Sequence, residues 1–145
     1  MDSDLKKKGI LVVDDERGPR ETLRYLLVSS GYRSIHVAAS GPDGLKHLET
    51  FGSAIYLVLL DVRMPGMTGI EFFQRVAASH PHPVGVVVVT GYPSPETRQA
   101  FAGLATETAM ALDYVAKPFE ATDVLRSVAR SLDTVHQRRQ GTPLA

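Results

Sequence analysis

The chain has 145 residues, of which 43% are hydrophobic and 22% charged, and these values are typical of one folded domain with a single core. Equal numbers of basic and acidic residues argue against a strong overall attraction to nucleic acid or anionic lipid. The lack of cysteine excludes disulfides and thiolate metal sites, and the longest apolar runs are too short to span a membrane. We therefore expect a soluble, cytoplasmic domain with no direct contact to membranes or nucleic acid.

Apolar runs predict the strands. Continuous runs rich in valine, isoleucine and leucine are what a parallel sheet requires when helices cover both of its faces. The run at 34–38 is more polar than the others, so we expect it near an edge. In chain order the candidate strands are ILVV (10–13), SIHVA (34–38), YLVLL (56–60), VVVV (86–89) and DYVA (113–116).

Segments with helical spacing separate these strands. Pro19 fits the first turn of a first helix, Gly31 follows that helix, and Thr68 is the expected N-cap of a third. Ser94 and Pro95 open a fourth helix. Apolar stripes mark the second helix, with Leu45 and Leu48, and the fifth, with Ala121, Val124, Leu125, Val128 and Leu132.

Strand and helix alternate five times, which predicts an α/β fold with a doubly wound, five-stranded parallel sheet and five helices. Among the common topologies, the strand order 2-1-3-4-5 is our preferred one. We place the domain at residues 9–133. The charged lead-in at 1–8 and the segment 134–145 are expected to be unstructured, the latter as a tail or as the start of a linker.

Chemically active side chains follow four of the strands. Asp14 and Asp15 come after the first, Asp61 after the third, Thr90 after the fourth and Lys117 after the fifth. Ligands bind at this carboxyl edge in open α/β sheets. Three carboxylates held together repel one another unless a hard cation joins them, and an oxygen-only site suits Mg²⁺. An acid in such a place, flanked by an ammonium and a hydroxyl, can accept a phosphoryl group.

Four motifs stand at the ends of predicted strands: VVDDE (12–16), LLDVRMPGMTG (59–69), VVVTGY (87–92) and YVAKPF (114–119). They resemble the motifs of response-regulator receiver domains and stand in the same order. The resemblance covers about residues 9–133 and implies a flavodoxin-like fold. It also implies a signalling switch in a two-component system rather than an enzyme, one that assists its own phosphotransfer and autodephosphorylation.

The resemblance implies a role for each matched residue of the acidic site. Asp61 is the implied phosphoacceptor, and its donor is a sensor histidine kinase or a phosphotransfer protein. Asp15 binds Mg²⁺ directly, Asp14 helps through water, and the backbone carbonyl of Arg63 completes the protein ligands. Lys117 contacts the acceptor and then the phosphoryl group.

The resemblance also implies a switch. Thr90 swings toward the new phosphoryl group, and Tyr114 turns inward to fill the space that Thr90 leaves. The peptide bond between Lys117 and Pro118 is expected to be cis, a form whose cost is low only before proline. Arg63 and Tyr92 are expected to flank the phosphoryl group and to screen it from water.

The chain departs from the family pattern between Thr90 and Lys117, where it is several residues longer than usual. The excess lies around FAGLATETAMAL (101–112), on a surface that normally contacts partners. The downstream partner or output domain is therefore left open, as is oligomeric state, although receivers often pair through this surface as homodimers. The chain is either a stand-alone receiver or an excised part of a larger regulator or hybrid kinase.

Two other functions remain as alternatives. One is a phosphatase that uses Asp61 as a nucleophile on small phosphate esters, but such enzymes commonly carry a second acid where Arg63 stands. The other is a flavodoxin-like cofactor binder, which the fold alone does not exclude. No glycine-rich phosphate loop follows the first predicted strand, where DDERG (14–18) stands instead.

Overall fold

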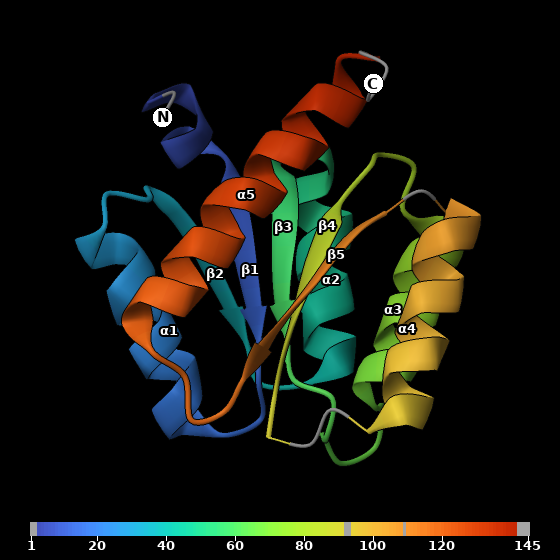
Figure 1. The fold of residues 1–145 in the computed structure, drawn as a ribbon. Coiled ribbons are helices and arrows are strands. Elements are labelled where there is room, and N and C mark those ends of the chain that lie inside the picture. Colours follow the sequence, from blue (N-terminus) through green and yellow to red (C-terminus); the bar gives the residue numbers. More distant parts are fainter. Residues whose placement is uncertain (1–2, 92–93, 109, 142–145) are drawn as a thin grey trace.

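A computed structural model describes residues 3–91, 94–108 and 110–141. Its five parallel strands form one sheet in the order β2-β1-β3-β4-β5, which confirms the predicted topology (Figure 1). Every predicted strand is present, four of them longer than expected by one or two residues. The strands are β1 (Gly9–Val13), β2 (Ser34–Ala38), β3 (Ile55–Leu60), β4 (Gly85–Thr90) and β5 (Ala111–Ala116).

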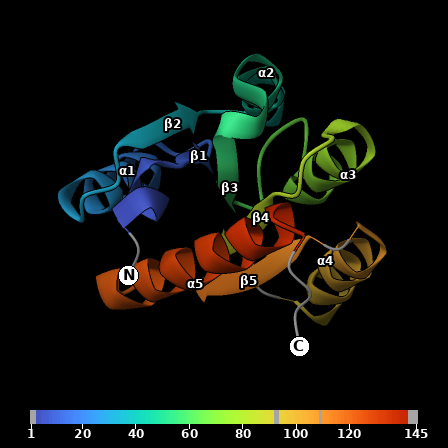
Figure 2. The ribbon, with the colours of Figure 1, turned by 90° about the horizontal axis from the view of Figure 1, so that it is seen from above.

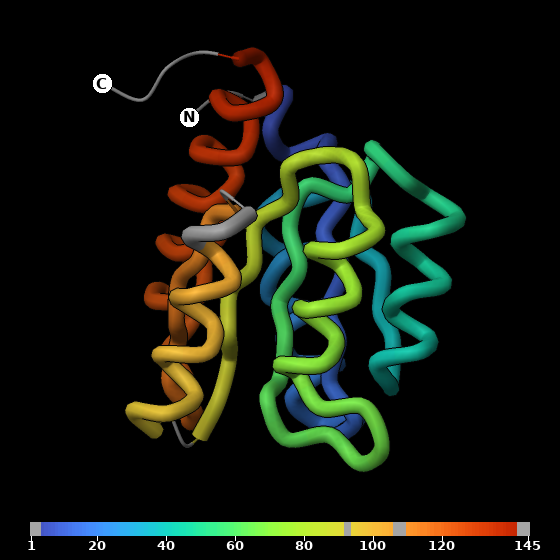
Figure 3. The backbone as a smooth tube through the Cα atoms, turned by 90° about the vertical axis from the view of Figure 1, so that its right-hand side faces the viewer, coloured from blue at the N-terminus to red at the C-terminus, as the bar shows by residue number. Residues whose placement is uncertain are grey.

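Helices cover both faces of the sheet. Seen from above, α1 and α5 lie on one face and α2, α3 and α4 on the other (Figure 2). Figure 3 shows α3 between α2 and α4. The helices are α1 (Arg17–Ser29), α2 (Gly41–Phe51), α3 (Gly69–Ser79), α4 (Pro95–Thr108) and α5 (Ala121–Arg139), with short 3-10 helices η1 (Ser3–Lys7) and η2 (Gly52–Ala54).

The apolar stripes of these helices pack on the alternating side chains of the strands. Leu23 and Leu27 of α1 lie in the same layer as the stripe of α5. Phe72 and Phe73 of α3 and Phe101 of α4 fill the opposite layer. Full burial of side chains of this size is worth about 1.5–3 kcal/mol each. The two layers therefore hold β1, β3 and β4 in the middle of the molecule, where their C-terminal ends are rigid.

The start of α3 is fixed by the predicted N-cap, Thr68. Its hydroxyl accepts a hydrogen bond from the Glu71 backbone N–H at 3.2 Å. The Glu71 carboxylate in turn accepts one from the Thr68 N–H at 3.3 Å. This reciprocal pair satisfies two donors that a helix N-terminus otherwise leaves without partners. The loop between β3 and α3 therefore ends at a helix start that these hydrogen bonds fix.

The described residues near both ends of the chain are more ordered than the sequence predicted. Residues 3–7 form η1, and Leu5 is buried. Helix α5 continues past residue 133 to Arg139, with Val135 in the core. The Arg139 guanidinium explains the extra length, because it donates hydrogen bonds to the backbone carbonyls of Ser53, Ile55 and Pro83. It also stacks on the ring of Tyr56, 3.8 Å from the centroid.

The segment in which we expected extra length is divided between two elements. Residues 101–108 complete α4, and Ala111 and Leu112 begin β5. Phe101 is fully buried against Phe73 of α3, with ring centroids 5.3 Å apart. The first part of this segment therefore anchors α4 on α3. None of the described helices is long and apolar enough to cross a membrane.

Candidate functional site

Three backbone hydrogen bonds continue the sheet ladder past the strand ends and bring the predicted site together. The Asp61 N–H donates to the Val13 carbonyl at 3.0 Å, just before Asp14. The Asp14 N–H donates to the Ala38 carbonyl at 3.1 Å. At the far side, the Lys117 N–H donates to the Thr90 carbonyl at 2.9 Å. The central strands of the sheet therefore position the acids at one edge. This is the arrangement that we predicted from the places of these residues directly after the strands.

Asp14, Asp15 and Asp61 form a cluster of carboxylates at this edge. One ligand oxygen from each lies within 4.8 Å of the others. Asp14 and Asp61 are buried, with 1% and 6% of their surface exposed. The Oδ1 atom of Asp15 is buried and has no hydrogen-bond partner among the residues that the structure describes. Oxygens bound to one Mg²⁺ stand about 2.9–4.2 Å apart, so the trio fits this ion after small side-chain movements.

Lys117 extends over this cluster from the end of β5. Its ammonium donates a hydrogen bond to Asp14 Oδ2 at 2.9 Å. It also lies 3.7 Å from Asp61 Oδ1. One cation thus faces two buried carboxylates, a pairing that tolerates burial better than an isolated charge does.

The charges of the site shift the pKa values of Asp61 and Lys117. Burial raises the pKa of Asp61 to about 6, and the attraction of Lys117 offsets only part of the increase. The negative charges of Asp14 and Asp15 raise it further. For Lys117, burial lowers the pKa, but the hydrogen bond to Asp14 and the charges of Asp14, Asp61 and Glu16 outweigh this and raise it. Without a bound metal ion, the ionised form of Asp61 is therefore unfavourable, even though the protonated Lys117 lies beside it.

The loop after Asp61 approaches the acid closely. Gly66 has a φ of 78°, a conformation that favours glycine. A Cβ atom on Gly69 would lie 2.6 Å from the Asp61 carbonyl oxygen, so only glycine fits there. Arg63 makes a backbone hydrogen bond to the Asp61 carboxylate, while the residue itself is exposed.

Two contacts at this site were missed from the sequence. The Glu16 backbone N–H donates to Asp14 Oδ1 at 2.9 Å. The Arg20 guanidinium donates to the Asp14 carbonyl, also at 2.9 Å. The sequence did contain a signal for these contacts. Helix α1 begins with arginines and has no acid in its first turn. Such an arrangement is unfavourable at the positive N-terminal end of a helix unless acids lie nearby.

The remaining predicted residues lie in different surroundings. Thr90 is buried at the end of β4, and Tyr114 is half-buried in β5. The Tyr114 hydroxyl donates to the Arg98 carbonyl of α4 at 3.3 Å. Tyr92 lies outside the described residues. The predicted cis peptide bond between Lys117 and Pro118 is confirmed.

A doubly wound parallel sheet that carries a carboxylate trio and a lysine at one edge defines an α/β protein with an acidic pocket at the carboxyl ends of its strands. The family profile described as "Response regulator receiver domain" matches residues 10–129. The chain therefore belongs to the response regulator receiver domains of two-component signalling, which act as switches.

Curated relatives agree with this family. The transcriptional regulatory protein DltR of Streptococcus agalactiae is 33% identical over 138 residues, which are 91% of this chain and 57% of DltR. The transcriptional regulatory protein ZraR of Escherichia coli is 34% identical over 134 residues, or 92% of this chain and 28% of ZraR. The chain therefore spans little more than half of DltR and less than a third of ZraR.

Among solved structures, the chemotaxis protein CheY4 of Vibrio cholerae aligns with a TM-score of 0.75 at 26% identity. The alignment covers 86% of this chain and 98% of CheY4. This likeness to a chain of receiver size agrees with the doubly wound fold described above.

Proposed function

We propose that Asp61 accepts a phosphoryl group from the phosphohistidine of a sensor kinase or a phosphotransfer protein. The observation that carries the proposal is the convergence of Asp14, Asp15, Asp61 and the Lys117 ammonium at one edge of the sheet. Burial and repulsion raise the energy of the ionised Asp61, and both penalties fall when cations pair with its carboxylate.

The chemical step is a displacement at phosphorus. A carboxylate oxygen of Asp61 forms the new bond to phosphorus as the bond to the donor's histidine nitrogen breaks, and that nitrogen keeps the electron pair. Charge is spread over the phosphoryl oxygens in the transition state. The Lys117 ammonium, 3.7 Å from Asp61 Oδ1, is placed to neutralise part of it.

The same trio supports Mg²⁺ binding. Asp15 offers a buried oxygen to which no described residue donates a hydrogen bond, and Asp61 and the Arg63 carbonyl complete the direct ligands that we propose. Asp14 already accepts hydrogen bonds from the Lys117 ammonium and the Glu16 N–H. We therefore propose that it contacts the ion through a water molecule. When bound, Mg²⁺ supplies positive charge for the carboxylates and the transferring phosphoryl oxygens.

Incubation with acetyl phosphate tests this function, because a small donor removes the need for the unknown kinase. With Mg²⁺, intact-mass measurement should show one phosphoryl group per chain, and borohydride reduction should convert the labelled Asp61 to homoserine. EDTA should prevent the labelling, and Asp43→Asn, at an exposed acid of α2, should leave it unchanged. Labelling at another residue, or multiple turnover on a phosphate ester, would overturn the proposal. The family assignment itself gives the phosphatase alternative no support.

We propose that Thr90 and Tyr114 carry the signal away from Asp61. Tyr114 pairs with Val88, two residues before Thr90, so Tyr114 and Thr90 lie on the same face of the sheet. Phosphorylation draws the Thr90 hydroxyl toward the phosphoryl oxygens and opens space for the Tyr114 ring. The phosphoryl group thereby shifts an equilibrium between two side-chain arrangements.

Arg98 is the residue that holds Tyr114 in the unphosphorylated arrangement. Its guanidinium lies 4.5 Å from the ring centroid, and its carbonyl accepts the tyrosine hydroxyl. An exposed cation–π contact is worth about 0.5–1 kcal/mol. We therefore expect Arg98→Ala to raise the population of inward Tyr114 in the unphosphorylated protein roughly two- to fivefold.

This population is measured by NMR of protein with isotope-labelled tyrosine rings, with Tyr114→Phe to assign the signal. Arg126→Ala is the matched control, because Arg126 is an exposed arginine of α5 whose side chain pairs with Asp123. A Tyr114 signal that is the same in Arg98→Ala and native protein would contradict this role for Arg98.

The partners follow from the family and from the relatives. We propose a histidine kinase or a phosphotransfer protein upstream. Since this chain spans only part of DltR and ZraR, we propose a downstream protein or output domain as the recipient of the signal. The surface of α4, β5 and α5, which carries Arg98 and Tyr114, is the proposed site of that contact and of any homodimer.

A further inference from the structure

A cavity of about 600 Å³ lies between α2 and α3, and no residue of the acidic site lines it. Its lining comes from the later turns of both helices and from residues 80–82, which follow α3. Both helices run away from the edge of the sheet that carries Asp61, so the cavity lies toward the opposite edge. Its volume is within the range of sites that bind small molecules, about 300–1,000 Å³.

Part of the cavity wall is apolar. Leu45 and Leu48 line it from α2, and Val76 and Ala78 line it from α3. Gly52, at the end of α2, has open space where a Cβ atom would stand, so no side chain narrows the cavity there. Each CH₂ group of a ligand that leaves water for such a wall improves affinity about fourfold. The wall therefore favours a ligand with an apolar part.

The cavity also contains a cation, the guanidinium of Arg75. Arg75 is exposed on α3, and its backbone carbonyl accepts a hydrogen bond from the Ser79 hydroxyl at 2.7 Å. Its side chain forms no hydrogen bond or ion pair within the part of the chain that the structure describes. Glu49 lines the cavity from α2, yet these two side chains do not pair. The Arg75 guanidinium is therefore available to an anionic group of a ligand.

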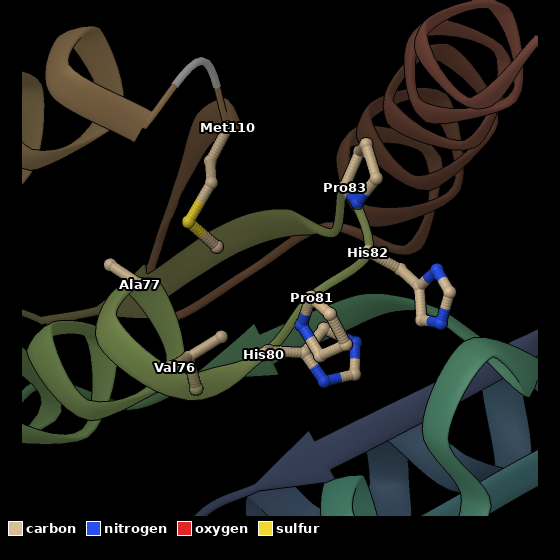
Figure 4. A pocket seen from close by; sticks show the side chains of 7 residues that line it. All are labelled: Val76, Ala77, His80, Pro81, His82, Pro83 and Met110. Atoms are coloured by element: carbon tan, nitrogen blue, oxygen red, sulfur yellow. The ribbon is translucent and has the colours of Figure 1, made fainter.

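The loop after α3 adds a second hydrogen-bond donor. Figure 4 shows His80 and His82 on one side of this loop and Met110 on the other. His82 is exposed, and even a neutral imidazole carries one N–H donor. The proline after His82 confines its backbone to extended conformations, which limits the positions of the ring. Arg139 donates to the Pro83 carbonyl at 2.8 Å and brings a second guanidinium to the same loop.

We propose that this cavity binds a small amphipathic carboxylate, a molecule with a short apolar chain or ring and one carboxylate group. The apolar part packs on the leucines of α2 and on Val76, and the carboxylate accepts hydrogen bonds from Arg75 and His82. A guanidinium matches a carboxylate through two parallel hydrogen bonds. A free phosphate ion would leave the apolar wall in water, and a neutral apolar ligand would leave Arg75 without a partner.

Titration of the full chain with octanoate, followed by NMR of leucine and valine methyl groups, tests the site. Octanol and octylammonium are matched probes, because they carry the same chain with a neutral and a cationic head group. We expect octanoate to bind with a Kd of about 0.1–1 mM, a range within reach of a ligand of about ten non-hydrogen atoms. The largest shifts should occur at Leu45, Leu48 and Val76. Octanol should bind roughly tenfold more weakly, and octylammonium more weakly still.

Three substitutions at exposed lining positions separate charge from shape. Arg75→Gln removes the cation and should weaken octanoate binding roughly tenfold while leaving octanol binding unchanged. Glu49→Gln removes a like charge and should strengthen octanoate binding about twofold. Ala78→Leu keeps both charges but fills part of the cavity, so it should weaken the binding of octanoate and of octanol. Thermal unfolding of each variant should match that of native protein.

Arg33→Gln is the matched control. Like Arg75, Arg33 is exposed, and its side chain forms no hydrogen bond or ion pair with a described residue, but it stands before β2 and does not line the cavity. Its variant should bind octanoate with native affinity. The proposal is wrong if octanoate does not bind, if all three probes bind equally, or if Arg75→Gln keeps native affinity. Shifts confined to methyl groups outside the cavity would also overturn it.

Discussion

Replacing Asp61 by asparagine is expected to abolish phosphorylation by acetyl phosphate and, in Mg²⁺-free buffer at pH 8, to raise the free energy of unfolding by about 1–3 kcal/mol. Asparagine has nearly the same shape but no charge. The substitution removes an anion that burial and the charges of Asp14 and Asp15 make unfavourable. Loss of activity together with a gain in stability is the mark of a residue kept for function at a cost to the fold.

The size of this gain should depend on pH. The pKa of Asp61 is about 6 in the folded protein, against 3.8 as its ordinary value. Between these values the folded state binds more protons than the unfolded state, so the stability of the native protein falls as pH rises through about 6. The difference between Asp61→Asn and native protein should therefore be small near pH 4 and complete above pH 7.

Urea unfolding at a series of pH values in EDTA measures this effect. Asp133→Asn, at an exposed acid away from both ends of α5, is the control and should change stability little at any pH. Mg²⁺ should stabilise native protein more than Asp61→Asn, because the variant lacks one anionic ligand. If Asp61→Asn is destabilising at pH 8, Asp61 is not the unfavourable anion described here.

Replacing Lys117 by methionine is expected to slow phosphorylation by acetyl phosphate roughly 10²–10³-fold, the usual cost of removing one group that stabilises transition-state charge. Methionine keeps most of the chain length but loses the ammonium, which lies 2.9 Å from Asp14 and 3.7 Å from Asp61. Lys46→Met, at an exposed position of α2, should have the native rate.

The pH profile separates two explanations for a slow Lys117→Met variant. Lys117 lowers the pKa of Asp61, so its loss also leaves more of the acceptor protonated. If protonation alone were responsible, the rate would recover between pH 7 and 9. We expect it to remain low, because the missing charge acts on the transferring group. A native rate at pH 7 would exclude Lys117 from the reaction.

The sheet and the acidic site could be predicted because their signals are local. Fully buried strands such as β1 and β4 contain unbroken apolar runs, and parallel strands have their C-terminal ends at one edge. Asp14 and Asp61 each follow such a run directly, and Lys117 follows the more polar strand β5. Their meeting place therefore follows from topology alone, without knowledge of any side-chain contact.

The missed features depend on contacts between distant segments. Ser127 and Ser131 interrupt the apolar stripe of α5, yet both are buried, and Ser127 donates to Asp113 of β5 at 2.7 Å. The end of α5 that was missed, residues 134–139, adds a single apolar core residue, Val135, which is too little for a periodic signal. Likewise, nothing near Arg139 in the sequence reveals that its hydrogen-bond acceptors lie more than fifty residues earlier.

The three carbonyls held by Arg139 bear on how this receiver can be recombined with other modules. A version cut at residue 133 would keep every side chain of the phosphorylation site but would leave these acceptors without their donor. Engineered fusions should therefore join the next module beyond Gly141, where the last described turn of the chain ends. A biosensor assembled from the shorter version would contain a less stable receiver. Its signal in the absence of phosphorylation would therefore be higher.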